Sequence, residues 1–94
     1  MAQEFSHDEG QHRYSLRIDG ALASAVDYVV NDNHISFTHT FTDPKQRGKG
    51  LAGEIVQFAV DDVEANTPYR VVPMCWYVGK WFDEHPERSG LLSR

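Results

Sequence analysis

The sequence is poor in cysteine, with Cys75 as the only one among its 94 residues. A single thiol cannot form an internal disulfide, and zinc sites built on several cysteines are excluded as well. The remaining candidate ligands are histidines, and His7, His12, His34 and His85 show no spacing typical of a metal site. We therefore predict a protein without a bound metal.

Long apolar runs are also absent, and no stretch approaches the roughly 18 apolar residues of a membrane-spanning helix. Residues 1–10 are polar and acidic, without the apolar centre of a signal peptide. These absences predict a cytoplasmic protein that does not bind membranes. We expect residues 1–10 to form a flexible tail and residues 11–94 to form a single domain.

Basic residues are scarce, with nine Lys and Arg against 14 Asp and Glu, which gives a net charge of −5. An acidic surface of this kind argues against a general nucleic-acid binder. Nevertheless, Lys45, Arg47 and Lys49 lie within five positions of one another. Such a local basic cluster on an acidic protein predicts a small anionic ligand at that point.

Alternating apolar and polar residues predict three strands, over 12–18, 21–30 and 34–42. Short turn sequences at 19–20 and 31–33 join them into an antiparallel meander. In the third strand the alternation places four side chains together on one face, namely Ile35, Phe37, His39 and Phe41.

The second half of the chain changes to a helical period. Apolar residues between 52 and 63 recur at intervals of three and four, which predicts an amphipathic helix ending near residue 66. Residues 69–74 read as a short strand, and residues 76–85 read as a second helix that stops at Pro86. The fold class is therefore α/β (α+β), with the order β-β-β-α-β-α and a mixed, mostly antiparallel sheet.

The basic cluster lies in a loop between a strand and a helix, and this loop contains Gly48 and Gly50. Glycines let the backbone approach a ligand, and the free amides at a helix start attract phosphate groups. The P-loop spacing is not present, and no acidic strand end follows as in dinucleotide-binding domains. The alternative is an ordinary glycine-rich turn with solvated basic side chains.

The segment 42–52, TDPKQRGKGLA, resembles motif A of the GNAT acetyltransferase superfamily. Gly48 and Gly50 match the two small positions of the motif, and Lys45 stands where Gln or Arg is usual. Together with His39-Thr40 and the later segment 72–78, VPMCWYV, the loop is similar to the small YjdJ-type GNAT-like family. The resemblance covers roughly residues 12–86.

This resemblance implies a minimal GNAT-type fold with acetyl-CoA in a cleft between the third strand and the strand that begins near Tyr69. It implies that loop amides hold the pyrophosphate and that a backbone amide near Phe41-Thr42 polarises the acetyl carbonyl. The cofactor-binding residues predicted in this way are Phe41, Thr42, Lys45, Gln46, Arg47, Gly48, Lys49, Gly50, Leu51 and Ala52.

Three side chains are candidates for catalysis. Cys75, at a predicted helix start, is either a nucleophile, an acid or a small residue that lines the site. Tyr77 is either a general acid near the CoA sulfur, as the resemblance suggests, or part of an aromatic cluster. His39 is either a base or a core histidine on an apolar strand face.

The function predicted from the sequence is acetyl-CoA-dependent transfer of an acetyl group to a primary amine, either a small amine or a protein lysine or N-terminus. The alternative is a non-catalytic acyl-CoA-binding or interaction module, because 94 residues leave no room for the helices that wall the acceptor site in larger GNAT enzymes. We expect a monomer or a weak homodimer.

Overall fold

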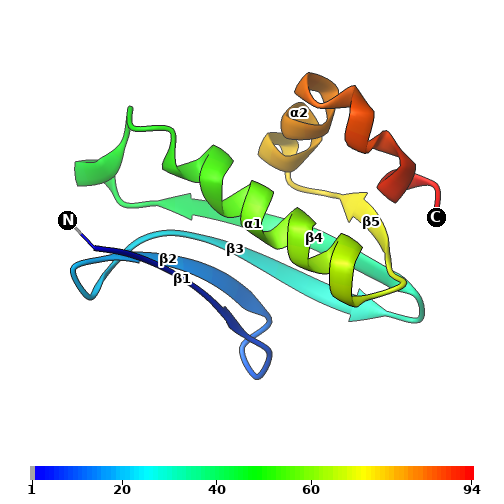
Figure 1. Ribbon diagram of the computed structural model, residues 1–94, viewed down its shortest axis with the longest axis horizontal. Helices are drawn as coiled ribbons and strands as arrows, with labels where there is room; N and C mark the ends of the chain where they lie inside the picture. The colour runs from blue at the N-terminus through cyan, green and yellow to red at the C-terminus, as the bar shows by residue number, and fades with distance from the viewer. Residues whose placement is uncertain (1) are drawn as a thin grey trace.

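The computed structural model describes residues 2–94, which form a single five-stranded sheet with helices on one face (Figure 1). The strands lie in chain order across the sheet, and their bounds are β1 Gln3–Asp8, β2 Arg13–Ile18, β3 Ala21–Asn31, β4 His34–Thr42 and β5 Arg70–Pro73. The helices are η1 Pro44–Gln46, α1 Leu51–Asn66, α2 Trp76–Glu84 and η2 Pro86–Leu92. The α+β class predicted from the sequence is confirmed.

Strands β1 to β4 form an antiparallel meander, of which the turn sequences predict β2 to β4. Asp19 and Gly20 both have positive φ, of 51° and 85°, which closes the tight turn between β2 and β3. Asp32, with φ of 54°, has the same role between β3 and β4. Asp and Gly tolerate this left-handed region better than most residues, so the turns follow directly from the sequence.

The predicted flexible tail is wrong for most of its length, because Gln3–Asp8 forms strand β1 and pairs with β2 from Gln3↔Ile18 to Asp8↔Arg13. Phe5 explains why this segment is held on the sheet. Its half-buried ring stacks on Phe58 of α1 at 5.1 Å between ring centres. The stacking of Phe5 and of His7, which lies on the Tyr14 ring at 4.0 Å, and one ladder of backbone hydrogen bonds order a segment whose composition is polar.

Helix α1 covers one face of the sheet and supplies much of the core. Its apolar face is almost completely buried, as the helical spacing predicted, and consists of Leu51, Ile55, Val56, Ala59, Val60 and Val63. Each of the larger side chains contributes roughly 1.5–3 kcal/mol by leaving water. The opposite partners come from β2, β3 and β4, and include Leu16, Val26 and Phe37. None of the helices within residues 2–94 is long and apolar enough to cross a membrane.

Strand β5 is parallel to β4 but pairs with only its first half, from His34↔Arg70 to Phe37↔Pro73. Beyond Phe37 the chain after β5 turns away into α2, and the second half of β4 has no neighbouring strand on that side. The last backbone hydrogen bond on this side of β4 runs from the amide of Cys75 to the carbonyl oxygen of Phe37, at 2.9 Å. The two strands therefore diverge at Phe37 and leave a gap.

A β-bulge interrupts β4 at the same level. Tyr28 pairs with Phe37 and the preceding Asp27 pairs with His39, so Thr38 is an extra residue in β4. An extra residue reverses the alternation of side chains beyond it. The prediction that His39 and Phe41 share a face with Ile35 and Phe37 is therefore wrong.

Candidate functional site

The glycine-rich loop connects β4 to α1 through the short helix η1, whose start is capped by Asp43. The Asp43 carboxylate accepts a hydrogen bond from the backbone amide of Lys45 at 2.9 Å. Gly48 and Gly50 both have positive φ, of 83° and 75°, and a Cβ placed at either one would meet no atom within 4 Å. The backbone conformation therefore requires glycine, while the space around it stays open to a ligand.

Helix α1 begins without a side-chain cap, because its N-cap residue is Gly50. The first backbone hydrogen bond of the helix runs from the amide of Glu54 to the carbonyl of Gly50. The amides of Leu51, Ala52 and Gly53 precede it and have no acceptor within the helix. These free amides and the positive end of the helix dipole form an anion-binding concavity at the loop.

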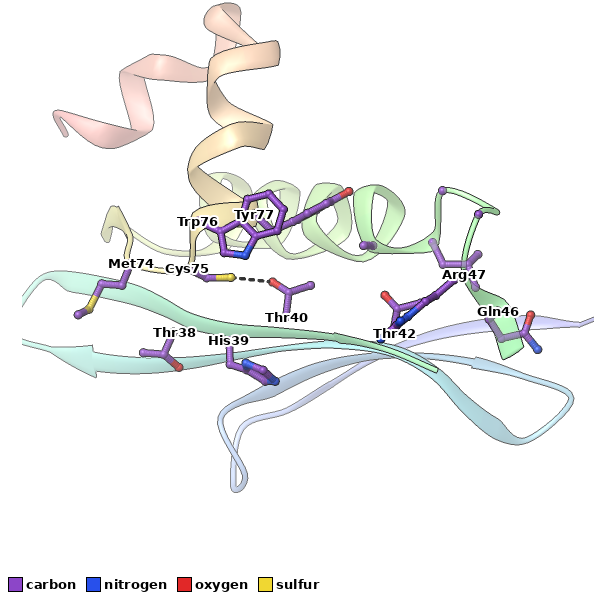
Figure 2. Close-up of a pocket in the computed structure, with 14 residues that line it drawn as sticks. Thr38, His39, Thr40, Thr42, Gln46, Arg47, Met74, Cys75, Trp76 and Tyr77 are labelled. Carbon is purple, nitrogen blue, oxygen red and sulfur yellow. Dashed lines mark hydrogen bonds between the residues drawn. The ribbon is translucent and has the colours of Figure 1, made fainter. Parts of the chain in front are cut away.

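A pocket of about 720 Å³ extends from this loop to the gap between β4 and β5 (Figure 2). Its residues come from β4, the loop, the start of α1 and the start of α2. They are Thr38, His39, Thr40, Thr42, Gln46, Arg47, Gly48, Gly50, Leu51, Ala52, Met74, Cys75, Trp76 and Tyr77. The pocket thus joins the predicted anion loop to the predicted catalytic residues in one continuous space.

Most of the predicted cofactor-binding residues line this pocket, and three do not: Phe41, Lys45 and Lys49. The Lys49 ammonium donates to Oε1 of Gln46 at 3.0 Å. Lys45 is held by its backbone in the capped turn of η1. Arg47 is therefore the basic side chain that the loop presents to the pocket.

The thiol of Cys75 stands at the other end of the pocket, at the N-cap position of α2. Its Sγ lies 3.5 Å from Oγ1 of Thr40, the contact drawn as a dashed line in Figure 2. Burial alone would raise the pKa of this thiol. The Thr40 hydroxyl and the backbone amides of Tyr77, Val78 and Thr40 outweigh that effect, and the net pKa of Cys75 is lowered.

Thr40 is a site residue that the sequence reasoning missed. Without the bulge its side chain would face away from the helices, whereas the bulge at Thr38 turns Thr40 and Thr42 toward Cys75 and the pocket. The amide of Asp43 donates to β3, at the carbonyl of Ala23. The backbone amides of Thr40 and Thr42 therefore face the open side of β4.

Tyr77 also lines the pocket, and burial raises the pKa of its hydroxyl. The hydroxyl oxygen is close to α1, because a Cβ added to Gly53 would lie 3.5 Å from it. In Figure 2 the Tyr77 ring points from α2 toward the start of α1, while the Cys75 sulfur points toward Thr40. The structure therefore brings Tyr77 to the wall of the pocket and the Cys75 thiol to its end.

His39 lies on the side of β4 opposite to Cys75 and Thr40, together with Thr38 (Figure 2). Both residues nevertheless border the pocket, because it opens through the gap between β4 and β5. The helix-free face of the sheet lies on this side (Figure 1). His39 is thus an exposed residue that lines the pocket, in place of the predicted member of an apolar strand face.

Two exposed apolar side chains flank Cys75 in the sequence and line the pocket with it. Met74 is 68% exposed and Trp76 is 75% exposed, the two highest values among the large apolar residues described. The sequence gives little indication of this exposure, because Met74 and Trp76 are also compatible with a buried helix start. Among residues 2–94 there is no group of three His, Cys, Asp or Glu side chains that could hold a metal ion.

Residues 13–91 of the chain match a protein-family model. The description of that family is GCN5-related N-acetyl-transferase. None of the curated proteins compared with the chain matches it.

Proposed function

The chain belongs to the GCN5-related N-acetyltransferase family, and on that premise we propose that it transfers an acetyl group from acetyl-CoA to a primary amine. The observation that carries this proposal is the continuous pocket between the Gly48–Gly50 loop and the Cys75 thiol. An anion-binding end and a reactive end within one space suit a molecule that has a pyrophosphate and a thioester.

The loop residues fit the pyrophosphate of acetyl-CoA. The free amides of Leu51 and Ala52 would donate to its oxygens, and the glycines allow the backbone to approach closely. The Arg47 guanidinium would add a charge-assisted hydrogen bond. The distal lysine pair, Lys45 and Lys49, would contribute only long-range attraction, in contrast to the direct role that the sequence predicts for them.

The second half of β4 fits the acetyl end. Its backbone amides at Thr40 and Thr42 face the gap, where either one would donate to the carbonyl oxygen as negative charge develops. The oxyanion donor would then be either Thr42, within the predicted pair Phe41-Thr42, or Thr40, one residue before that pair. When bound, acetyl-CoA supplies an acetyl thioester that an amine can attack.

The acceptor amine would reach this gap from the helix-free face of the sheet, where His39 borders the opening. A neutral imidazole there would accept the ammonium proton and leave the nitrogen free to form the new bond to carbon. As the carbon–sulfur bond breaks, the thiol of Cys75 would donate a proton toward the departing CoA sulfur. Covalent catalysis by the Cys75 thiolate is the competing route, because its lowered pKa also suits a nucleophile.

A non-catalytic acyl-CoA-binding module is the second candidate function, and the bare sheet face is compatible with it. No helix among residues 2–94 covers that face, so nothing in the described chain encloses an acceptor (Figure 1). An open acceptor side is compatible with a large acceptor such as a protein amine. It is equally compatible with binding that is not followed by transfer.

Release of CoA thiol in the presence and absence of acceptors separates the two functions. We expect the wild-type chain to release CoA faster when a lysine-containing peptide or a polyamine is added. Tight binding of acetyl-CoA with release that does not depend on any acceptor would instead support the binding module. Intact-protein mass spectrometry after incubation with acetyl-CoA tests the covalent route, which requires an acetyl adduct that Cys75→Ala abolishes.

A further inference from the structure

A second cavity, of about 420 Å³, lies at the C-terminal end of α1 and shares no residue with the pocket at Cys75. It is formed by β1, β2 and β3 on one side and by the end of α1 and the start of β5 on the other. Its lining residues are His7, Glu9, His12, Tyr14, Tyr28, Val30, Ile35, Asn66, Thr67 and Tyr69. Three tyrosines and two histidines give this cavity an unusually aromatic wall.

The aromatic rings of the wall are fixed relative to one another. The His7 ring stacks on Tyr14 with 4.0 Å between ring centres, and its Nε2 is hydrogen-bonded to the Tyr28 hydroxyl at 2.5 Å. The ring of His12 stacks on the Tyr28 ring, with 5.3 Å between ring centres. A ligand would therefore meet preformed rings, and little conformational freedom would be lost when it binds.

Charges of both signs lie around the cavity: the Arg94 guanidinium donates to the backbone carbonyls of Thr67 and Tyr69 at 2.8 and 3.1 Å, and Nδ1 of His7 lies 3.5 Å from the Asp62 carboxylate. Glu9 lines the cavity and forms no ion pair within residues 2–94, whereas Asp62 lies behind the wall and accepts a hydrogen bond from Tyr14 at 2.7 Å. No Lys or Arg is among the lining residues. The pKa of Tyr28 is raised, first by burial and then by the charges of Glu9 and Asp62. The cavity is therefore aromatic, with the unpaired carboxylate of Glu9 in its wall and no Lys or Arg side chain among its lining residues.

We propose that this cavity is a binding site for a small organic ammonium ion, separate from the acetyl-transfer site. Aromatic ring faces attract cations, and ammonium groups are recognised by walls of this composition. Tyr69 and Glu9 would contribute most, because Tyr69 is only partly buried and Glu9 is unpaired. The inference rests on neither acetyl-CoA nor acetyl transfer, so the site would remain even if the chain proved to be catalytically inactive.

The test uses choline as the cation and its neutral tert-butyl analogue as a control of the same shape. Titration of the full, isotopically labelled chain is followed by changes in backbone amide chemical shifts. Choline should shift the amides of Glu9, Thr67 and Tyr69 in a saturable way at millimolar concentration, whereas the neutral analogue should not. Equal shifts from both compounds, or no shift at tens of millimolar choline, would overturn the proposal.

Matched variants assign the effect to the wall. Tyr69→Ala should weaken choline binding by about fivefold or more, whereas Tyr69→Phe, which keeps the ring, should retain it. Glu9→Gln should also weaken binding, whereas Glu87→Gln, at an exposed position of η2, should not. If Tyr69→Ala and Glu9→Gln fold normally and bind choline as tightly as the wild type, the cation site does not exist.

Discussion

The hydroxyl oxygen of Thr40 lies 3.5 Å from the sulfur of Cys75, across the gap where β4 and β5 diverge. This contact joins the bulged strand to the start of α2, and it helps to lower the pKa of the Cys75 thiol. Thr40→Val should remove the hydrogen bond while it preserves the shape of the side chain. The thiol of the variant should then react with iodoacetamide only at higher pH than the wild-type thiol does.

The pH dependence of this alkylation shows directly whether the pKa of the Cys75 thiol is lowered or raised. A thiolate stabilised in the folded state is present at a lower pH than an ordinary thiolate. The alkylation rate of the wild type should therefore rise at a lower pH than that of a model thiol. Thr38→Val, at the exposed bulge residue, serves as the control and should leave the curve in place. Superimposable curves for the wild type and Thr40→Val would show that the contact has no influence on the thiol.

The loop glycines provide a second prediction. Gly48→Val places a β-branched residue at a φ of 83°, which costs about 1–2 kcal/mol in strain and moves the amides of the loop. Acetyl-CoA affinity, measured by calorimetry, should fall by at least about tenfold. Gly90→Ala is the matched control, because Gly90 has no positive φ and open space around it. Unchanged affinity in Gly48→Val would remove the loop from the binding site.

His39 provides a third prediction, on the acceptor side. If its imidazole accepts the proton of the acceptor ammonium, His39→Ala should lower the acceptor-dependent rate by about 100-fold or more at neutral pH. Acetyl-CoA affinity should stay the same, because the residue lies across β4 from the thiol (Figure 2). His85→Ala, distant from the pocket, should change neither quantity. If His39→Ala retains the full rate, His39 only lines the pocket and does not accept the proton.

The C-terminal residue Arg94 provides a prediction about stability. Its guanidinium donates to the backbone carbonyls of Val63, Glu64, Thr67 and Tyr69, at 2.8–3.3 Å. The carbonyls of Val63 and Glu64 belong to the last turn of α1, where a positive charge is favourable, and those of Thr67 and Tyr69 lie in the segment between α1 and β5.

Arg94→Ala should therefore lower the free energy of unfolding in urea by about 1–3 kcal/mol. Arg17→Ala, at an exposed strand position, should change that free energy by less than about 0.5 kcal/mol. Equal effects of the two substitutions would mean that the observed cap does not stabilise α1.

Tyr14 provides a prediction about alkaline pH. Burial, followed by the hydrogen bond to Asp62, raises the pKa of Tyr14 well above its ordinary value. A phenol with a raised pKa in the folded state stabilises the fold below about pH 10 and loses that contribution as the pH rises further. Tyr14→Phe should be less stable than the wild type at neutral pH. The two should converge above pH 10 in urea unfolding, and a constant difference would contradict this linkage.

The regular elements could be predicted from the sequence because their signals are local. The spacing of apolar residues in α1 and the Asp19-Gly20 turn each place an element within a residue or two of where it lies. Strand β1 could not be found in this way, because contacts distant in sequence hold its polar residues on the sheet, among them the stacking of Phe5 on Phe58 and of His7 on Tyr14. The conformation of this segment therefore depends on tertiary contacts that no local pattern indicates.

The residues of the candidate site also fall into two groups, those with a local sequence signal and those without one. Short sequence segments indicate the Gly48–Gly50 loop and the helix-start position of Cys75, so both could be predicted from the sequence. The pairing of Thr40 with Cys75 depends on the bulge at Thr38, and no local pattern indicates where an extra residue enters a strand. The alternation rule therefore assigned His39 to the core and Thr40 to the outside, the reverse of their positions.

Transfer of an isotopically labelled acetyl group from acetyl-CoA to a primary amine tests the central claim most directly. The wild-type chain should produce labelled acetyl-amine in proportion to time and enzyme concentration. Gly48→Val should reduce this product sharply, and Gly90→Ala should not. If acetyl-CoA binds to the pocket but no labelled amine accumulates above the uncatalysed background with small amines or lysine peptides, the chain is not an acetyltransferase.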